Sequence, residues 1–522
     1  MSSDINTLRR PSQTPIQQFY DGANILITGG TGFFGRVLLS KLLSDCPGVS
    51  RIYLLIREKR GKTTKERFEE IFEGEFFDPM RARCPNYLTK MAAITGDCLK
   101  PGVGISPEDR KTLLDNIDVV FHCAATVRFD AHLKVAVNIN VRATRSLLEM
   151  AKDMKHLKSF VHVSTAYSNC RQPIIEERFY EPPVDPNHLI EVTDLLNDKM
   201  IDKITPGILD NWPNTYSLTK QVAEDMVRKM GIGMPVAMVR PSIVIATNKE
   251  PIPGWINNHY GPTGIVAGAG LGLLRSMHAD PELVADMVPA DNVINCIISA
   301  AYSVNKTWNE KKKSGELVSD ALDKNYPDDT DVEIYNYISS TQKPIKWKEF
   351  MALNEKAVPE IPSTFSIWAY CFTLNKYKPI HNLYILFLHL LPALIVDTAA
   401  KLLGRQPKLL DAYQKIHKFS QVISFFSTQQ FTFTNSNTQR LFTSLTEEDR
   451  SLFNFDMGQH DWEKYMFWHI RGIRAYLVKD PLSTVPEGLR LRRRLLVAHY
   501  LLIGALNIFF FFIFAKIVSF FL

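Results

Sequence analysis

This chain of 522 residues has no CxxC pair of cysteines and no dense basic run, and no secretory leader is expected at its N-terminus. Its seven cysteines are scattered and form no CxxC pair, so neither a zinc ribbon nor a disulfide framework is predicted. The first apolar run, residues 23–27, is too short and begins too late for the core of a signal peptide, which favours reduced thiols facing the cytosol. No run of Lys and Arg is interleaved with aromatic residues, which argues against nucleic acid as a partner. No metal site is predicted either.

Short apolar runs alternate with amphipathic stretches from residue 23 to about residue 345. Residues 1–22, by contrast, are polar and are expected to form a flexible leader. Strands that are apolar along their whole length and separated by helices indicate a parallel sheet covered on both faces. The expected fold class is therefore α/β, a doubly wound parallel-sheet Rossmann domain over residues 23–345. The predicted strands are Ala23–Thr28, Arg51–Ile56, Met91–Thr95, Val119–Cys123, Ser159–Ser164 and Val236–Val239, and the predicted helices include Val37–Ser44, Lys134–Lys152 and Ser217–Lys229.

Residues 346–480 are rich in Phe, Tyr, Leu and His at helical spacing, which predicts a mainly helical C-terminal domain. Residues 490–522 are expected to form a basic flank and a membrane-anchoring tail. Within them Leu495–Ala515 is apolar over the ~20 residues that cross a bilayer core. Four arginines lie just before it, which places the body of the protein on the cytosolic side. The alternative for this segment is a buried core helix.

A second apolar stretch, Leu383–Leu403, is long enough to consider as a span. It contains His389, Asp397 and Lys401, and charges at membrane depth are costly. A buried or membrane-surface helix is therefore favoured over a span. The formal net charge of +6 is compatible with a membrane surface or an anionic substrate.

A glycine-rich turn directly follows the first predicted strand. Gly29, Gly32 and Gly35 have GxxGxxG spacing between a strand and a helix, where the backbone can approach a pyrophosphate and the helix N-terminus can bind it. We therefore predict a dinucleotide site made by Thr28, Gly29, Gly32, Phe33, Phe34 and Gly35.

The second predicted strand ends at Arg57 instead of the acid that usually binds the ribose of NAD, although Glu58 is next to it. A cation there suits the 2′-phosphate of NADPH, and the alternative is a solvated basic loop. Asp97, after the third strand, is a candidate acceptor for the adenine amine or a simple turn residue. Ala124, after the fourth strand, is small where a cofactor would lie.

Tyr216 and Lys220 have YxxxK spacing, which brings both side chains to one face of a helix, one turn apart. The lysine ammonium can lower the pKa of the phenol and bind the nicotinamide ribose, while the phenol protonates a carbonyl oxygen. One chance YxxxK is expected in this composition, and Tyr302–Lys306 is a second match. Tyr216 is favoured because it lies between the strand that ends in Ser164-Thr165 and the next strand.

Further residues near this pair are candidates. Ser164 and Thr165 both offer hydroxyls that can orient a substrate carbonyl. Asn140, in a predicted helix, could position a catalytic water or the backbone near Lys220, or could simply be a buried, locally bonded amide.

Several segments together resemble the animal fatty acyl-CoA reductases, which belong to the extended short-chain dehydrogenases. They are Thr28–Gly35, Phe121–Phe129, His162–Tyr167, Tyr216–Lys220, Val239–Val244, Pro253–Ile256, Pro392-Ala393 with Asp397, and the terminal apolar segment. The match runs from about Phe19 to the tail. The branch that supplies fatty alcohol for ether lipids is the most similar. Alignment with the extended short-chain dehydrogenase pattern selects Thr165 over Ser164 as the catalytic hydroxyl.

This resemblance implies a two-step reduction of long-chain acyl-CoA by NADPH, through an aldehyde, to a primary alcohol for ether-lipid or wax synthesis. It also implies membrane lipid as a partner and favours the peroxisomal membrane over the endoplasmic reticulum. The residues alone predict only a membrane-attached NADPH carbonyl reductase. The rival enzymes are a membrane-bound hydroxysteroid dehydrogenase and a sugar-nucleotide epimerase of the same fold. A non-catalytic nucleotide sensor or scaffold is the rival from another class. The oligomeric state stays open.

Overall fold

The computed structural model describes residues 13–317 and 330–521. The chain forms two compact units that are interleaved along the sequence. The first contains residues up to 252, residues 286–344 and residues 431–460. The second contains residues 253–285, 345–430 and 461–522.

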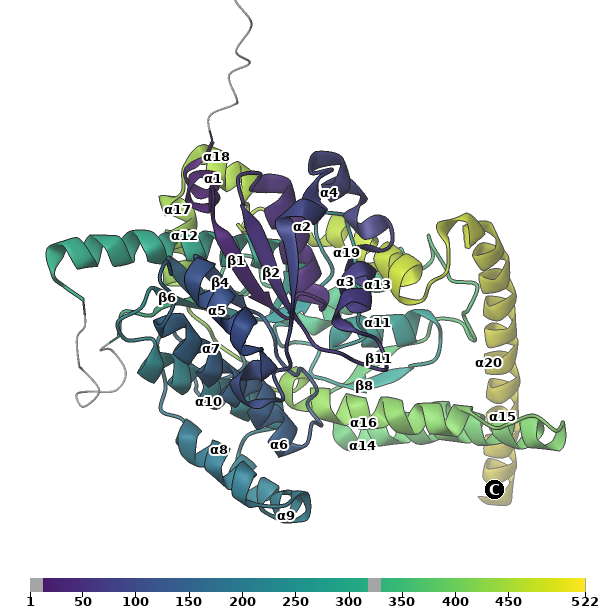
Figure 1. The fold of residues 1–522 in the computed structure, drawn as a ribbon. Coiled ribbons are helices and arrows are strands. Elements are labelled where there is room, and N and C mark those ends of the chain that lie inside the picture. Colours follow the sequence, from purple (N-terminus) through teal and green to yellow (C-terminus); the bar gives the residue numbers. More distant parts are fainter. Residues whose placement is uncertain (1–12, 318–329, 522) are drawn as a thin grey trace, which may run out of the picture. The chain divides into compact units, whose positions relative to one another are not determined.

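A seven-stranded parallel sheet forms the centre of the first unit, in the order β10-β6-β5-β4-β1-β2-β3 (Figure 1). This confirms the predicted doubly wound α/β fold class. The strands are β1 Asn24–Thr28, β2 Arg51–Ile56, β3 Met91–Thr95, β4 Val119–His122, β5 Ser159–Val163, β6 Val236–Pro241 and β10 Glu333–Tyr337. A separate two-stranded sheet pairs β7 Ile243–Ile245 with β9 Met287–Pro289.

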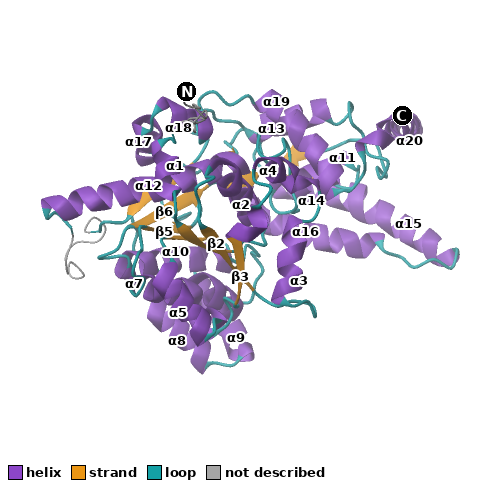
Figure 2. Ribbon diagram, turned by 45° about the horizontal axis from the view of Figure 1, so that its top comes forward, coloured by secondary structure: helices purple, strands orange, loops and turns teal. Residues whose placement is uncertain are grey.

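Helices cover both faces of this sheet, which explains why the central strands β4, β5 and β6 are buried along their whole length. Figure 2 shows α5, α7 and α10 on one side and α2 and α12 on the other. The helices of the unit are α1 Pro15–Tyr20, α2 Phe33–Asp45, α3 Thr64–Glu69, α4 Asp78–Arg83, α5 Pro107–Asn116, α6 Leu133–Ala136, η5 Val137–Arg142, α7 Ala143–Lys152, α8 Pro186–Leu195, α9 Asp198–Leu209, α10 Thr215–Met230, α12 Ala290–Ser314, α17 Ser436–Ser444 and α18 Glu447–Leu452.

The expected flexible leader is partly a helix. Residues 1–12 lie outside the described residues, but residues 15–20 form α1. A capping box between Thr14 and Gln17 starts this helix, and Ile16 and Tyr20, four residues apart, are fully buried. The Tyr20 hydroxyl donates to the carbonyl of Ile298 on α12 at 2.9 Å. The polar composition of this segment concealed a short amphipathic helix.

The seventh strand, β10, was not predicted, and it depends on a distant part of the chain. Asn336 on β10 donates from its side-chain amide to the carbonyl of Thr434 at 2.9 Å. Tyr337 donates to the carbonyl of Phe455 at 2.8 Å. Residues 431–460 therefore complete the first unit, although they follow much of the second unit in sequence.

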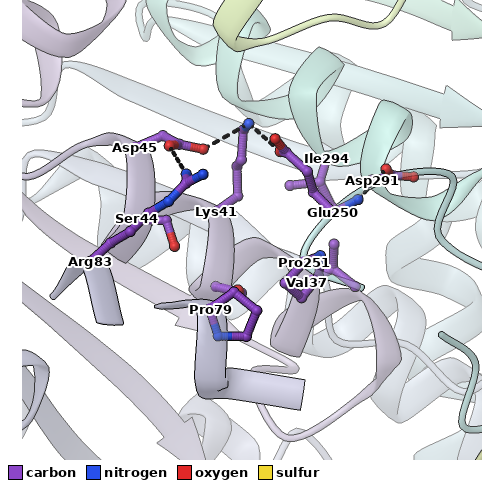
Figure 3. Close-up of a pocket in the computed structure, with 11 residues that line it drawn as sticks. Val37, Lys41, Ser44, Asp45, Pro79, Arg83, Glu250, Pro251, Asp291 and Ile294 are labelled. Atoms are coloured by element: carbon purple, nitrogen blue, oxygen red, sulfur yellow. Dashed lines mark hydrogen bonds and ion pairs between the residues drawn. The ribbon is translucent and has the colours of Figure 1, made fainter. Parts of the chain in front are cut away.

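A cavity of about 50 Å³ beside α2 is far smaller than the ~300–1,000 Å³ of ordinary ligand pockets. Lys41 lies in it between two carboxylates, 2.8 Å from Asp45 and 2.5 Å from Glu250 (Figure 3). None of the predicted site residues lines this cavity. We interpret it as a packing defect around a buried ion pair.

The second unit is mainly helical, as predicted. Its helices are α11 Pro262–Gly270, α13 Trp347–Ala357, α14 Lys378–Tyr384, η6 Ile385–Leu390, α15 Leu391–Leu402, α16 Leu409–Ser427, α19 Trp462–Gly472, η7 Ile473–Leu477 and α20 Val485–Phe521. A short parallel pair, β8 Ser276–His278 and β11 Thr373–Asn375, is an addition to the prediction.

Two helices of this unit are long and apolar enough to cross a membrane by length and composition, residues 378–402 and 482–521. The window in the second contains no buried residue, so the alternative of a buried core helix receives no support there. Only 17% of the window in the first is buried, and the buried helix considered for Leu383–Leu403 is not what the structure shows.

Candidate active site

The glycine-rich turn joins β1 to α2 and leaves no room for side chains. Gly29 has a φ of +78°, and a Cβ there would meet the backbone nitrogen of Ala124 at 2.9 Å. A Cβ on Gly35 would lie 2.4 Å from both the Gly29 carbonyl oxygen and the Gly30 Cα. Such a bare turn ahead of a helix N-terminus lets backbone N–H groups reach a pyrophosphate. The residues present therefore fit a dinucleotide.

The other predicted residues of the turn surround this cradle. Phe33 and Phe34 open α2 after Gly32, and both are partly exposed. Thr28 is fully buried, and its hydroxyl accepts from the backbone N–H of Ala124 at 3.2 Å and contacts His122 Nδ1 at 2.8 Å. Its visible role is to join the ends of β1 and β4, so that Ala124 lies beside the turn.

Positive charge gathers at the end of β2, beside the turn. Arg57 lies 4.0 Å from Asp97, whose carboxylate also accepts from the N–H of Leu99. Arg67 on α3 donates to the carbonyl of Arg57, and its other amino group lies 3.5 Å from the hydroxyl of Thr31. Arg57 lowers the pKa of Lys59, as expected between like charges. Arg67 was not predicted, because only the folded chain shows that α3 returns to the glycine-rich turn.

Thr165, Tyr216 and Lys220 come together at the carboxyl end of β5. Asn214 caps the N-terminus of α10 through the N–H of Ser217, so the helix starts directly before Tyr216. Tyr216 forms a side-chain hydrogen bond with Thr165. Lys220, one turn later, is buried and donates to the carbonyl of Val163 at 2.7 Å. The second YxxxK match, Tyr302–Lys306, lies on α12 instead, with Tyr302 packed against Phe19.

The hydroxyls of Ser164 and Thr165 contact different residues, Glu224 for Ser164 and Tyr216 for Thr165. Its hydroxyl donates to the carboxylate of Glu224, a fully buried residue one turn beyond Lys220. Glu224 also accepts from Ser168 at 2.7 Å and forms an ion pair of 2.8 Å with the fully buried Arg240. Ser164 is thus part of a buried polar network below the site, whereas Thr165 is the hydroxyl beside Tyr216. Glu224 was missed by sequence reasoning, although its i+4 spacing from Lys220 is visible in the sequence.

Burial shifts the pKa values of both Tyr216 and Lys220, and the pKa of Tyr216 moves in the direction opposite to the one expected from the sequence. Burial raises the pKa of Tyr216 to about 12, against the opposing effect of its hydrogen bond with Thr165. Lys220 does not contribute to this shift in the pKa of Tyr216, and its ammonium donates to the Val163 carbonyl. Burial lowers the pKa of Lys220 to about 8, although Glu224 acts in the opposite direction. A neutral Tyr216 is a competent proton donor throughout the physiological range.

This arrangement predicts a loss of activity at alkaline pH. Lys220 has a lowered pKa, so its charged form is present below about pH 8 and is lost as the pH rises through that value. The initial rate of cofactor oxidation should not change with pH near neutrality. Above about pH 8 it should fall about tenfold for each further pH unit, as for the loss of one proton. Lys220→Arg, whose guanidinium stays charged, should be slower but should lose the alkaline fall. A wild-type profile that stays flat to the ordinary pKa of lysine would contradict the assignment.

Asn140 supports the loop that faces Tyr216. Its helix widens into the π-helical segment η5, a distortion that is frequent at functional sites. The Asn140 side chain accepts from the N–H of Thr126 at 3.0 Å and donates to the hydroxyl of Thr219 at 2.9 Å. The buried amide of Asn140 thus ties the loop at Thr126 to α10 at Thr219.

Phe129, in the same loop, stacks on the ring of Tyr216, with centroids 5.4 Å apart and planes at 28°. The sequence motif contained Phe129 but gave it no role. Its ring covers one side of the phenol and restricts the positions that the hydroxyl can occupy.

Comparisons with known proteins agree with this geometry. Two family models described as male sterility protein match the chain, an NAD-binding model over residues 27–297 and a second model over residues 388–480. The chain is 36% identical to "Fatty acyl-CoA reductase wat" of Drosophila melanogaster, over 94% of this chain and 90% of that protein. It is 38% identical to "Fatty acyl-CoA reductase 1" of Xenopus laevis (91% and 88%) and 37% identical to "Fatty acyl-CoA reductase 2" of Bos taurus (94% and 92%).

Solved structures show the same fold at low identity. The terminal R domain of the myxalamid PKS-NRPS pathway has a TM-score of 0.55 and 18% identity, covering 87% of this chain and 91% of that one. The reductase (R) domain of a non-ribosomal peptide synthetase from Mycobacterium tuberculosis has a TM-score of 0.54 and 14% identity, covering 90% and 94%.

Proposed function

Because this chain belongs to the fatty acyl-CoA reductase family, and so is a reductase with a nicotinamide cofactor, we propose that it converts long-chain fatty acyl-CoA to primary alcohol with NADPH. The observation that carries this proposal is the cluster of Thr165, Tyr216 and Lys220 at the same carboxyl edge of the parallel sheet as the glycine-rich turn.

The side chains at this cluster suit both steps of the reduction. NADPH, when bound, supplies a hydride to the carbonyl carbon. Tyr216 donates its phenolic proton to the carbonyl oxygen, and Thr165 donates a hydrogen bond that holds that oxygen. In the hemithioacetal formed from the thioester, the hydroxyl proton returns to the Tyr216 phenolate, the C–S bond breaks, and CoA leaves as its thiolate, which gives an aldehyde. In the second reduction Tyr216 protonates the aldehyde oxygen as the carbon takes a hydride from a second bound cofactor, and the phenolate then regains a proton from water. Lys220 would bind the ribose of the cofactor.

The preference for NADPH is supported by charge at the end of β2. Arg57, Lys59 and Arg67 gather there, and the strand does not end in the acid that usually binds an NAD ribose. Arg57 and Arg67 would hold the 2′-phosphate, since planar guanidinium groups match its geometry.

Arg57→Ala tests this preference. Loss of a charge-assisted hydrogen bond of ~1.5–3 kcal/mol should raise the KM for NADPH by about ten- to a hundred-fold, with little change for NADH. Lys62→Ala is the matched control, because Lys62 lies in the same basic loop but pairs with Glu70. Equal effects on both cofactors would remove Arg57 from the 2′-phosphate site.

We further propose that α20 anchors the chain in a membrane with the catalytic residues on the cytosolic side. Arg490 and its neighbours precede the apolar part of the helix, and a long acyl chain favours lipid by ~0.8 kcal/mol per methylene. We also propose that the alcohol is used for ether-lipid synthesis and that the membrane is that of the peroxisome. Both proposals depend on the similarity of the chain to the ether-lipid branch, with the endoplasmic reticulum as the second choice.

Protease added to intact organelles checks the orientation of this anchor. It should degrade the chain before α20 and spare an epitope appended after the C-terminus, until detergent opens the membrane. An epitope that is cleaved without detergent would reverse the proposed orientation.

Product analysis of the purified protein with palmitoyl-CoA tests the function itself. Hexadecanol formed with NADPH, at two cofactors oxidised per alcohol, would support the complete proposal. Aldehyde as the final product would restrict it to the first reduction. A folded protein that binds NADPH but oxidises none with any acyl-CoA would overturn it.

A further inference from the structure

The helix over residues 378–402 has two unlike faces. It consists of α14, η6 and α15 without a break. The four residues that it buries are His381, His389, Ala393 and Asp397, three of which are polar. Most of its exposed side chains are large and apolar, the reverse of a surface helix in water. They include Ile380, Leu383, Tyr384, Leu386, Phe387, Leu391, Leu394, Ile395, Val396 and Leu402.

Polar contacts within the second unit fix this orientation. His389 lies 3.0 Å from His417 of α16 through their ring nitrogens, and its other nitrogen accepts from the N–H of Arg275 at 2.9 Å. Asp397 accepts from the backbone N–H groups of residues 408–410, at the start of α16, at 2.9–3.1 Å. Turning the helix to bury its apolar side would break all of these bonds. The apolar face must therefore be covered from outside.

Basic side chains lie at the ends of the apolar face. Lys378 begins the helix, and Lys401, Arg405 and Lys408 follow around its end, all exposed. The carboxylate of Asp397, which lies between these basic residues in sequence, is hydrogen-bonded to backbone N–H groups at the start of α16. An apolar face with basic ends matches the boundary between acyl chains and anionic headgroups.

A transmembrane path fits this helix less well. α16 runs back along η6 and α15 (Figure 1). It is bonded to the middle of the 378–402 helix through His417 and His389, and to its C-terminal part through residues 408–410 and Asp397. Its own exposed residues include Asp411, Gln414, Lys415 and Lys418. A span over residues 378–402 would draw these charges toward the hydrocarbon, at a high cost.

We propose that the helix over residues 378–402 lies in the plane of the bilayer surface, with its apolar side chains among the upper acyl segments and its basic ends at anionic phosphates. The partner is a phospholipid surface with anionic headgroups. This attachment is separate from α20 and does not depend on the reaction that the active site catalyses.

Depth measurements on the full chain test this proposal. Cysteine is placed in turn at Leu383, Leu391 and Leu402, near the start, middle and end of the face, and is labelled with an environment-sensitive fluorophore. Gln414→Cys on α16 is the matched exposed control, and the wild-type chain treated in the same way corrects for native thiols. Each chain is reconstituted in vesicles of phosphatidylcholine with a minority of phosphatidylserine. Quenching is measured with iodide in the water and with lipids that carry spin labels at shallow or deep acyl positions.

The proposal expects similar results at all three positions. Shallow spin labels should quench more strongly than deep ones, and iodide should quench several-fold less than at Gln414. Omission of phosphatidylserine should weaken the lipid quenching. Deep quenching confined to Leu391 would show a span instead. Iodide quenching equal to that at Gln414 would show a face in water, and protection from iodide without lipid quenching would show a second copy of the chain on it. Any of these three results overturns the proposal, and none of them affects the reaction proposed for Tyr216.

Discussion

Tyr216→Phe is expected to reduce the rate of acyl-CoA reduction by ~10²–10⁴-fold and to leave cofactor binding nearly unchanged. The phenylalanine ring keeps the stacking with Phe129 but lacks the hydroxyl that donates a proton beside Thr165. The measurement is the steady-state oxidation of NADPH with palmitoyl-CoA, together with the dissociation constant of NADPH by fluorescence. A change in kcat without a change in NADPH affinity is the signature of a lost proton donor.

Tyr302→Phe is the matched control for this result. Tyr302 has the same YxxxK spacing to Lys306 but lies on α12 against Phe19. Its replacement should leave the rate unchanged. If Tyr302→Phe inactivated the enzyme and Tyr216→Phe did not, the active site would have been placed wrongly.

Glu224→Ala is expected to destabilise the first unit by about 3–5 kcal/mol. The substitution leaves the guanidinium of Arg240 buried without its carboxylate, and it removes the acceptor for Ser164 and Ser168. Removal of one partner of a buried ion pair costs far more than the net contribution of the pair, because the remaining charge keeps its desolvation penalty. The midpoint of urea unfolding, followed by fluorescence, measures the change.

Two comparisons separate this mechanism from general damage to the core. A double variant, Glu224→Met with Arg240→Met, removes both charges and should recover part of the lost stability. Lys111→Met breaks an exposed ion pair with Asp115 and should leave the unfolding midpoint unchanged. A Glu224→Ala variant as stable as the wild type would show that Arg240 finds another partner.

The central strands and the glycine-rich turn could be predicted because their signals are local. β2 and β3 begin and end at the predicted residues, since each contains an apolar run, residues 52–56 and 91–94, with polar residues on both sides. The turn could be placed because three glycines separate a strand from a helix. Tyr216 could be chosen over Tyr302 by its order among the strands, which a doubly wound sheet makes predictable.

The elements that were missed depend on contacts between distant residues. β10 contains polar residues, and the side chains of Asn336 and Tyr337 find their hydrogen-bond acceptors in the carbonyls of Thr434 and Phe455, about a hundred residues later. Arg67 is one of many surface arginines until α3 folds back toward Thr31. Glu224 is an unremarkable acid on a helix until β6 places Arg240 beside it. No local pattern encodes these pairings, so single-sequence reasoning could not identify them.

The interleaving of the two units has a consequence for biosynthesis. Because residues 431–460 complete the unit that contains Tyr216, a ribosome must make nearly the whole polypeptide before that unit has all its parts. Only residues 461–484 then separate the last of those parts from the start of α20. Completion of the catalytic unit and delivery of the apolar tail are thus late events that nearly coincide, so a chain stopped near residue 345 would yield no intact reductase domain.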